Sequence, residues 1–313
     1  MMEKVKNSLL SIFLLALMLG FFLVFIPKDA RGESGYAGAE TCKSCHASMY
    51  EKYAYTLHAE KSDPRTPASK MGCETCHGPG KAHVEAGGGK GVGGIMALGP
   101  ESTISKEKRD ATCLQCHSKG KVVMWKGSTH ESRGLSCTNC HSAHSGYRKN
   151  LAKKTQVEVC TQCHKKIRSD LRKSSHHPIR EGKMQCTSCH NPHGAIADKL
   201  ITANYTNLKC YECHAEKRGP YLWEHSPVTE DCTTCHTPHG SNHEFLLKGK
   251  QPYICQRCHA NSRHPSQLRA RSTTNAGQSV YTSQGAQLFY RSCQNCHIQV
   301  HGSNHPSGKS LMR

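Results

Sequence analysis

All 20 cysteines of this 313-residue chain lie in copies of a single pattern, Cys-x-x-Cys-His, which occurs ten times between Cys42 and His297. Cys-x-x-Cys-His is the attachment signature of a c-type haem, in which two thiols form thioethers and the adjacent histidine becomes the proximal iron ligand. Ten copies with the same gap predict ten covalently bound haem c groups. The predicted attachment residues are Cys42, Cys45, Cys73, Cys76, Cys113, Cys116, Cys137, Cys140, Cys160, Cys163, Cys186, Cys189, Cys210, Cys213, Cys232, Cys235, Cys255, Cys258, Cys293 and Cys296. The predicted proximal ligands are His46, His77, His117, His141, His164, His190, His214, His236, His259 and His297.

Paired cysteines have other uses, but these fit the pattern poorly. Zinc ribbons and thioredoxin-like redox sites also contain Cys-x-x-Cys. A zinc site needs no histidine directly after the second cysteine, and a redox motif is normally present once. A disulfide framework gives no reason for a constant two-residue gap. We therefore expect haem attachment at every motif.

The N-terminal 32 residues have the pattern of a signal peptide. Lys4 and Lys6 precede an apolar run over residues 9–26, and Ala30 and Gly32 are the small residues of a cleavage site. The run is also just long enough to cross a bilayer, so an uncleaved anchor is the alternative. Either interpretation places residues 33–313 on the exported side of the membrane, as one decahaem electron-transfer domain.

The predicted fold is a multihaem cytochrome c with short α-helices, mostly irregular backbone and little or no β-sheet. After residue 32 the chain offers roughly 28 residues per haem, too few to build a separate apolar core around each one. Aromatic residues make up only 6% of the chain. The haems themselves are therefore expected to form the core, and a haem-free polypeptide is expected to stay largely unfolded.

The formal net charge of +19 does not by itself indicate nucleic-acid binding. Each bis-ligated ferric haem brings a net negative charge, because its two propionates outweigh the single positive charge of the iron–porphyrin core. The lysines and arginines are expected mainly to offset these propionates. We therefore expect no nucleic-acid partner.

Successive motifs are spaced as a repeat. From the third to the ninth motif the first cysteines are 22 to 26 residues apart, and longer gaps of 31, 40 and 38 residues fall near the two ends. A fixed period predicts an elongated, quasi-linear array of haems, along which electrons can hop. The glycine-rich residues 87–94 lack the order of a phosphate-binding loop and are expected to be flexible. We expect haem pairs over residues 42–83, 113–144, 160–193, 210–239 and 255–305.

Two segments are expected to be helical. Residues 49–57 carry an apolar stripe at helical spacing. Residues 158–173 carry a second stripe, made of His164, Ile167 and Leu171, which would press that helix against its haem.

The remaining histidines are numerous enough to supply a second ligand to every iron. Iron with two imidazole ligands is closed to substrates, so a full set favours electron transfer over catalysis. After four odd-numbered motifs a histidine lies 11 to 13 residues beyond the proximal one, and after three even-numbered motifs one lies three residues beyond it. Three residues span only about 10 Å, so these latter histidines should ligate a neighbouring haem. The candidate distal ligands are His58, His83, His130, His144, His176, His193, His225, His239, His264 and His301.

Three histidines are left over from this assignment. They are His177, which competes with His176, His305, which competes with His301, and His243. His83 and His264 also depart from the regular offsets, since they lie six and five residues after the proximal histidines that precede them.

Three longer stretches carry a family resemblance. They are Cys186-Thr-Ser-Cys-His-Asn-Pro-His-Gly194, Cys232-Thr-Thr-Cys-His-Thr-Pro-His-Gly240 and the ending His301-Gly-Ser-Asn-His-Pro-Ser-Gly308. Together with ten motifs after a signal peptide, they make the whole mature chain resemble the MtrA/DmsE-type decahaem cytochromes. The resemblance implies bis-histidine ligation at all ten haems.

The resemblance also implies a location and partners. It implies a periplasm-facing chain of haems that threads an outer-membrane β-barrel of the porin type. The implied partners are an outer-surface multihaem cytochrome or terminal reductase, and periplasmic or inner-membrane electron-donor cytochromes. A mean hydropathy of −0.63 is compatible with this enclosed state and equally with a free soluble cytochrome.

We therefore expect an electron carrier and not an enzyme. One alternative is a multihaem reductase subunit with a single open catalytic haem. The other is an extracellular cytochrome that assembles into filaments. No Cys-x-x-Cys-Lys variant occurs in the chain, which argues against a catalytic haem with lysine ligation.

Overall fold

The computed structural model describes residues 35–259, 272–273, 279–280 and 292–312 of the chain. The backbone divides into two compact units, one within residues 1–104 and the other within residues 105–313. The division falls in the 40-residue interval between the second and third motifs. One electron-transfer domain over residues 33–313 stays a prediction. The predicted signal peptide and the candidate ligand His264 lie outside the described residues.

The first unit consists of short helices around two motifs. Glu74 links these motifs, because its carboxylate accepts hydrogen bonds of 2.7–2.9 Å from the backbone N–H groups of Ala37, Gly38 and Gly80. This buried side chain holds the start of the first motif against the second. The α-helices and 3₁₀-helices (η) of the unit are α2 (Ala39–Cys45), α3 (Ala47–Ala54), η2 (Leu57–Ala59), η3 (Pro67–Ser69), α4 (Glu74–His77), α5 (Lys81–Glu85) and η4 (Val92–Gly94).

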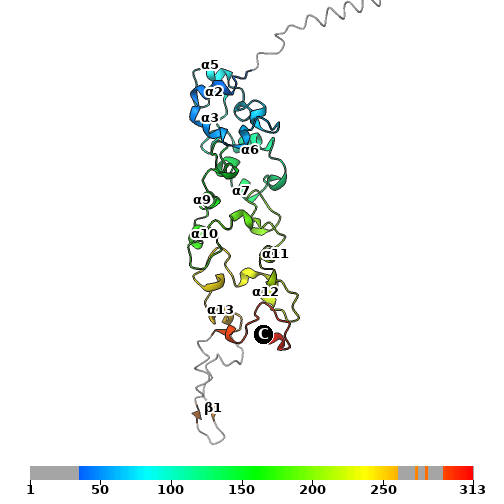
Figure 1. The fold of residues 1–313 in the computed structure, drawn as a ribbon. Helices are drawn as coiled ribbons and strands as arrows, with labels where there is room; N and C mark the ends of the chain where they lie inside the picture. The colour runs from blue at the N-terminus through cyan, green and yellow to red at the C-terminus, as the bar shows by residue number, and fades with distance from the viewer. Residues whose placement is uncertain (1–34, 260–271, 274–278, 281–291, 313) are drawn as a thin grey trace, which may run out of the picture. The chain divides into compact units, whose positions relative to one another are not determined.

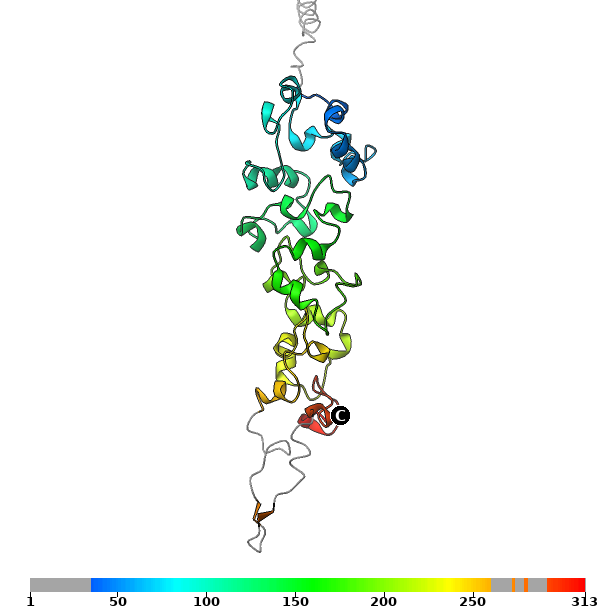
Figure 2. The same ribbon diagram turned by 90° about the vertical axis from the view of Figure 1, so that its left-hand side faces the viewer.

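The second unit repeats one plan several times. Both views show its elements following one another in chain order from α6 to α13 (Figures 1 and 2). The last described segment returns to residue 223, where Trp223 and Ser303 exchange two backbone hydrogen bonds of 2.9 Å. The helices are α6 (Lys106–Leu114), η5 (Gly120–Val122), α7 (Thr129–Ser132), α8 (Cys137–Cys140), η6 (Arg148–Asn150), α9 (Gln156–Cys160), α10 (Lys165–Asp170), η7 (Cys186–Ser188), η8 (Asp198–Leu200), α11 (Thr206–Tyr211), η9 (Ala215–Lys217), α12 (Ser226–Glu230), η10 (Cys232–Thr234), η11 (Glu244–Leu246), α13 (Tyr253–Gln256), η12 (Cys293–Asn295) and η13 (Gly308–Ser310).

All described helices are short, and the longest, α6, has nine residues. Among the described residues, none forms a helix with the length and apolar character needed to span a membrane. The Ser105 hydroxyl caps α6 by accepting from the backbone N–H of Lys108, and Thr155 forms a capping box with Glu158 at α9. Local capping therefore starts α6 and α9, and a haem motif ends each of them.

The two helices expected from apolar stripes are both shorter than predicted. The helix expected over residues 158–173 is interrupted, because α9 ends at Cys160 and α10 begins only at Lys165. The turn of the fifth motif occupies the residues between them. The helix expected over residues 49–57 ends at Ala54, and Leu57 lies 85% exposed in η2.

The β-structure of the described residues is minor. It consists of one antiparallel ladder, β1 (Ser272–Thr273) with β2 (Ser279–Val280), and five isolated bridges. The expected combination of short helices, irregular backbone and little β-sheet is confirmed. Three of the bridges recur at equivalent places and close loops onto the histidines of even-numbered motifs: His141–Leu151, His190–Ile201 and His236–Leu247.

The polypeptide has almost no apolar core of its own. In the part of the chain that the structure describes, the buried apolar side chains are Trp125, Val159, Leu171 and Leu311, whereas ten buried residues are polar or charged. A packed protein of this length normally buries far more apolar surface. The scarcity fits an interior completed by porphyrin rather than by side chains.

Candidate haem-binding sites

Each haem motif folds into one helical turn. In all ten motifs the backbone N–H of the histidine donates to the carbonyl oxygen of the first cysteine, at 2.9–3.1 Å. Residues three and four apart share one face of a helix, so each turn presents both thiols and the imidazole on the same side. Thioether attachment and proximal ligation require this arrangement. All 20 cysteines are free of disulfide bonds.

The imidazoles meet in facing pairs. Seven proximal histidines each lie opposite a second histidine, with ring centres 6.0–6.4 Å apart. The pairs, with the proximal residue first, are His46 with His83, His141 with His193, His164 with His130, His190 with His239, His214 with His177, His236 with His301 and His259 with His225.

The separation of the paired rings fits a haem iron. Imidazole nitrogens bind transition metals at about 2 Å, so two imidazoles on opposite sides of one metal have ring centres about 6 Å apart. On one side of each gap stand two cysteines and the proximal histidine, and on the other stands a second imidazole. The residues present therefore fit a bis-histidine haem c at each of these seven motifs.

The pairs form two interleaved series. Numbering the motifs 1 to 10 in chain order, motifs 5, 7 and 9 face a histidine from the segment after the preceding odd-numbered motif. Motifs 4, 6 and 8 face a histidine from the segment after the next even-numbered motif, so that His193, three residues after motif 6, faces His141 of motif 4. As the three-residue reach requires, none of these histidines faces the proximal histidine of its own motif.

The first motif departs from this rule because no odd-numbered motif precedes it. Its His46 faces His83, from the segment after motif 2. The Nδ1 atom of His83 lies 3.1 Å from the Val92 carbonyl oxygen, and a Cβ atom at Gly93 would lie 2.3 Å from the His83 backbone nitrogen. The glycine-rich residues 87–94, expected to be a flexible loop, instead fold against α5 and support this histidine.

His177, and not His176, faces the proximal histidine of motif 7. His177 lies 6.3 Å from His214. Both ring nitrogens of His176 are engaged, with Nδ1 2.7 Å from the Lys173 carbonyl and Nε2 3.1 Å from Glu181. The hydrogen bond with Glu181 raises the pKa of His176 and so favours a protonated ring, which cannot bind iron. The geometry therefore favours His177 over His176 as the candidate second ligand of motif 7.

The structure also distinguishes His301 from its competitor near the C-terminal end. His301 faces His236, whereas the Nδ1 atom of His305 accepts a hydrogen bond from the Ser307 backbone N–H at 3.1 Å.

The other candidate ligands stay predictions. His58 is half-buried in η2, where its carbonyl accepts a hydrogen bond of 2.6 Å from the Tyr53 hydroxyl. His144 is half-buried in the turn after motif 4, and His264 lies outside the described residues. The roles of His77, His117 and His297 as proximal ligands also stay predictions.

Backbone carbonyls orient the proximal imidazoles of all five even-numbered motifs. A neutral imidazole that donates from Nδ1 keeps Nε2 free, which is the tautomer that a metal needs. Three of the carbonyls belong to Lys149, Lys199 and Phe245, whose φ angles of 55–57° cost about 1–2 kcal/mol each. The Nδ1-to-oxygen distances are 2.5–3.1 Å for His77 to Met96, His141 to Lys149, His190 to Lys199, His236 to Phe245 and His297 to Ser310.

Burial keeps the facing imidazoles of the even series neutral. Desolvation lowers the pKa of His193, His239 and His301, and neighbouring positive charges, including the imidazole opposite, lower it further. A lowered pKa extends the neutral, metal-binding form to lower pH.

Neighbouring motifs lie near one another at their cysteines. Within each predicted haem pair the first cysteines interact thiol to thiol: Cys42 with Cys73, Cys113 with Cys137, Cys160 with Cys186, Cys210 with Cys232 and Cys255 with Cys293. Between pairs the second cysteines are close enough to interact electrostatically: Cys140 and Cys163, Cys189 and Cys213, Cys235 and Cys258. Motifs 3 to 10 therefore form a continuous series of neighbours.

Single buried polar side chains hold the motifs of a pair together. Asp110, three residues before motif 3, accepts a hydrogen bond of 2.9 Å from the backbone N–H of Cys137 in motif 4. Asn207, three residues before motif 7, accepts one of 2.7 Å from Cys232 in motif 8 and donates to two carbonyls. Gln156 makes the corresponding link between motifs 5 and 6. Sequence reasoning missed these residues, although their shared place before odd-numbered motifs was an available signal.

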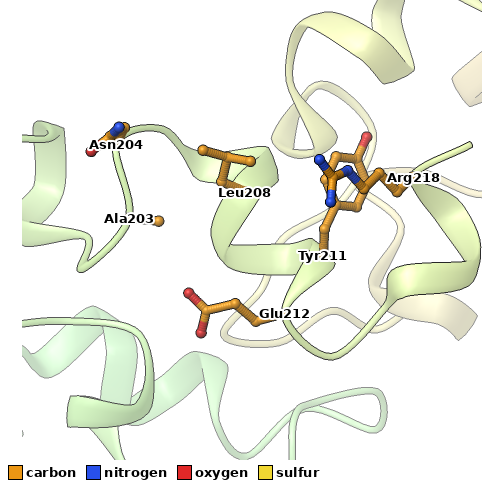
Figure 3. Close-up of a pocket in the computed structure, with 6 residues that line it drawn as sticks. All are labelled: Ala203, Asn204, Leu208, Tyr211, Glu212 and Arg218. Carbon is orange, nitrogen blue, oxygen red and sulfur yellow. The ribbon is translucent and has the colours of Figure 1, made fainter. Parts of the chain in front are cut away.

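A surface pocket of about 410 Å³ adjoins motif 7 (Figure 3). Its lining residues include no cysteine or histidine, and its Glu212 is paired with Lys209 at 2.6 Å. The pocket is lined by Ala203, Asn204, Leu208, Tyr211, Glu212 and Arg218.

Comparison with known proteins finds matches along most of the chain. The family model of the doubled CXXCH motif matches residues 130–169, 176–219 and 225–264, and the model of cytochrome c554 and c-prime matches residues 28–78 and 97–142. The chain is 42% identical to the multiheme cytochrome MtrA of Shewanella baltica (strain OS185) over 291 residues, which cover 91% of this chain and 84% of that protein.

Two further relatives match over shorter stretches. The C-type polyheme cytochrome OmcB of Geobacter sulfurreducens (strain DL-1 / KN400) is 29% identical over 39% of this chain and 16% of its own length. The dissimilatory sulfite reductase MccA of Wolinella succinogenes is 24% identical over 61% of this chain and 29% of its own length.

Replacing Asn207 with alanine should loosen the link between motifs 7 and 8. The side chain is 1% exposed, and its removal leaves one N–H group and two carbonyls without these partners. We expect the free energy of unfolding to fall by roughly 1–3 kcal/mol, as measured by chemical denaturation of the haem-loaded protein. The matched control Asn204→Ala, at an exposed position, should be neutral, and an equal loss in both variants would contradict the link.

His177→Ala should open the iron of motif 7, and His176→Ala should leave it closed. Carbon monoxide binds to reduced haem iron only where an axial position is free, so its uptake by the reduced protein distinguishes the two variants. We expect uptake above the wild-type level in His177→Ala alone. Uptake in His176→Ala alone would restore the sequence-based assignment.

Proposed function

Because this chain belongs to the MtrA family of multihaem c-type cytochromes, we propose that it is the haem-carrying component of an electron conduit across the outer membrane. It is an electron-transfer protein that binds haem c, and it acts as a carrier and not as an enzyme. The proposal adds the route that the electrons take and the partners at its two ends.

The residues of the chain suit electron transfer because they hold the two imidazoles of a site in fixed positions and in the neutral form. Haem iron, when bound, supplies a couple that takes up and returns one electron. Facing imidazoles, such as His190 with His239, would fill both axial positions and exclude substrates from the metal. Carbonyl acceptors such as Lys199 hold the tautomer, and burial holds the imidazoles neutral.

One observation carries the proposal, and it is the continuous series of neighbouring motifs from motif 3 to motif 10. Neighbouring cysteines alternate between first and second positions along this series, so each interior motif has a neighbour on either side. An enzyme needs one accessible site, whereas a conduit needs a series with no gap. In the second unit the haem motifs are arranged as such a series.

We further propose ten haem c groups, each with two histidine ligands. All ten motifs share the same helical turn, which supports attachment at each one. The remaining distal ligands would be His58, His144 and His264, in addition to those that face a proximal histidine.

The proposed location is the periplasm, in association with the outer membrane. Residues 1–32 would be the export signal. The proposed partners are a porin-like outer-membrane β-barrel, an outer-surface multihaem cytochrome or terminal reductase, and periplasmic or inner-membrane electron-donor cytochromes. Nucleic acid is not among them.

The two alternatives considered from the sequence are less well supported. A reductase role would draw on the match to the sulfite reductase MccA, but this chain spans only 29% of that protein at 24% identity. A filament with ligands exchanged between subunits is disfavoured, because seven motifs already face a histidine of the same chain.

Low-temperature electron paramagnetic resonance of the oxidised protein, quantified per iron, tests the ligation. We expect every iron to be low-spin. Five of the seven pairs have ring planes within 14–24° of parallel, whereas His130 and His164 are inclined at 78°. The latter pair should give a distinct, more anisotropic low-spin signal, and any high-spin iron would contradict full bis-histidine ligation.

Removal of one interior haem tests the conduit in intact cells of the native host. Cys186→Ala combined with Cys189→Ala abolishes attachment at motif 6, in the middle of the series of neighbouring motifs. Electron exchange with an insoluble extracellular mineral should fall to the level of cells that lack the chain. Ser188→Ala, which keeps both thioethers, is the control, and normal exchange in the cysteine variant would exclude a single continuous path.

A further inference from the structure

Three short segments lie where the two series of motifs cross. We call them crossing segments, and they are Pro192-His193-Gly194, Pro238-His239-Gly240 and Val300-His301-Gly302. The histidine of each faces the proximal histidine of an even-numbered motif, with ring centres 6.0–6.2 Å apart. The residues on either side of that histidine have had no role assigned so far.

The residue before the histidine serves the odd series. The Pro192 carbonyl oxygen lies 2.8 Å from the Nδ1 atom of His130, and that of Pro238 lies 2.7 Å from the Nδ1 atom of His177. His130 and His177 are the histidines that face motifs 5 and 7. Each carbonyl therefore fixes the ring orientation of a histidine that faces an odd-numbered motif. The histidine next to that carbonyl in the chain faces an even-numbered motif.

The third crossing segment does not make this hydrogen bond within standard limits. His225 faces motif 9, with its ring centre 6.1 Å from that of His259, and the Val300 carbonyl lies near it. The Nδ1 atom of His225 makes no hydrogen bond of standard length and angle. The geometry is thus tightest in the first two crossing segments.

The residue after the histidine leaves no room for a side chain. A Cβ atom at Gly240 would lie 1.9 Å from the Asp170 carbonyl oxygen, and one at Gly194 would lie 2.3 Å from the Met124 carbonyl oxygen. Both obstacles are backbone atoms, which cannot move aside as a side chain can. Asp170 and Met124 lie shortly before His177 and His130 in the chain. Each glycine therefore sets the distance between its crossing segment and the chain segment that leads to the histidine facing an odd-numbered motif.

We infer that each crossing segment is one positioning element for two haems, and that Gly194, Gly240 and Gly302 are its positioning residues. Its histidine would ligate an even-numbered haem, and its preceding carbonyl would orient the distal ligand of an odd-numbered haem. The inference rests on the proposed bis-histidine ligation. The crossing segments thereby join motifs 4 and 5, 6 and 7, and 8 and 9. The first cysteines, in contrast, join motifs 3 and 4, 5 and 6, and 7 and 8.

Gly240→Ala tests the inference through the number of irons that it opens. An added methyl group would push the crossing segment away from Asp170 and disturb His239 and His177 together. We expect carbon monoxide uptake by the reduced Gly240→Ala protein to equal the summed uptake of His239→Ala and His177→Ala. The control is Gly99→Ala, where a Cβ atom meets nothing within 4 Å, and it should match the wild type.

Each other outcome overturns a different statement. Uptake equal to that of His239→Ala alone would mean that the crossing segment positions only its own histidine. No uptake, in a protein that carries its full haem complement, would mean that the glycine positions neither ligand. Uptake by the wild type itself would refute the proposed ligation, and so the two failures are distinguishable.

A second variant serves if Gly240→Ala fails to mature. At Gly302 a Cβ atom would meet the Tyr221 side chain, 2.2 Å from its Cδ2 atom, and a side chain can be removed. Gly302→Ala should open the irons of motifs 8 and 9, as His301→Ala and His225→Ala do separately. Because the φ angle of 135° at Gly302 strains an alanine in any surroundings, adding Tyr221→Ala should reverse only part of this effect, and reversal at one iron only would contradict the inference.

Discussion

The gap of 6.0–6.4 Å between facing imidazoles is the distance on which the rest of this structure depends. A chain of this kind gains little from packing side chains on one another, and it must instead hold pairs of rings in position on either side of a flat cofactor. The helical turn of each motif places the proximal ring of a pair, and in the even-numbered motifs the carbonyls of left-handed residues such as Lys199 orient it. Carbonyls such as that of Pro238, and close backbone contacts such as that of Gly240, fix the facing ring.

The polar groups of the polypeptide therefore do the work that apolar side chains do in ordinary domains. Asp110 and Asn207 are buried, and each is satisfied by backbone groups of a second motif. A buried polar group is costly unless its hydrogen bonds are made, so such links are specific for one arrangement of the motifs. They determine which motifs lie together, while the porphyrins would supply most of the apolar contact.

The parts of the site that depend on local sequence could be predicted, and the parts that depend on distant contacts could not. The attachment cysteines and proximal histidines follow from a five-residue pattern that folds as a single turn. The distal ligands could be selected only as candidates, because spacing does not say where a segment returns. His176 and His177 occupy nearly the same offset, and only the folded chain shows that His177 faces His214 while His176 pairs with Glu181. The glycine-rich residues 87–94 have the composition of a flexible loop, and their contact with His83 is visible only in three dimensions.

The two series point in opposite directions along the chain, and this gives the sites an order of completion. His130, His177 and His225 precede the motifs that they face, whereas His193, His239 and His301 follow theirs. In a chain exported with its N-terminus first, an odd-numbered site in the interior has both imidazoles available as soon as its own motif emerges. An even-numbered site has to wait, with one imidazole only, until the segment after the next even-numbered motif arrives. Each arriving crossing segment would then complete an even-numbered site behind it and orient the second histidine of an odd-numbered site that has already emerged, so that the array matures toward the C-terminus.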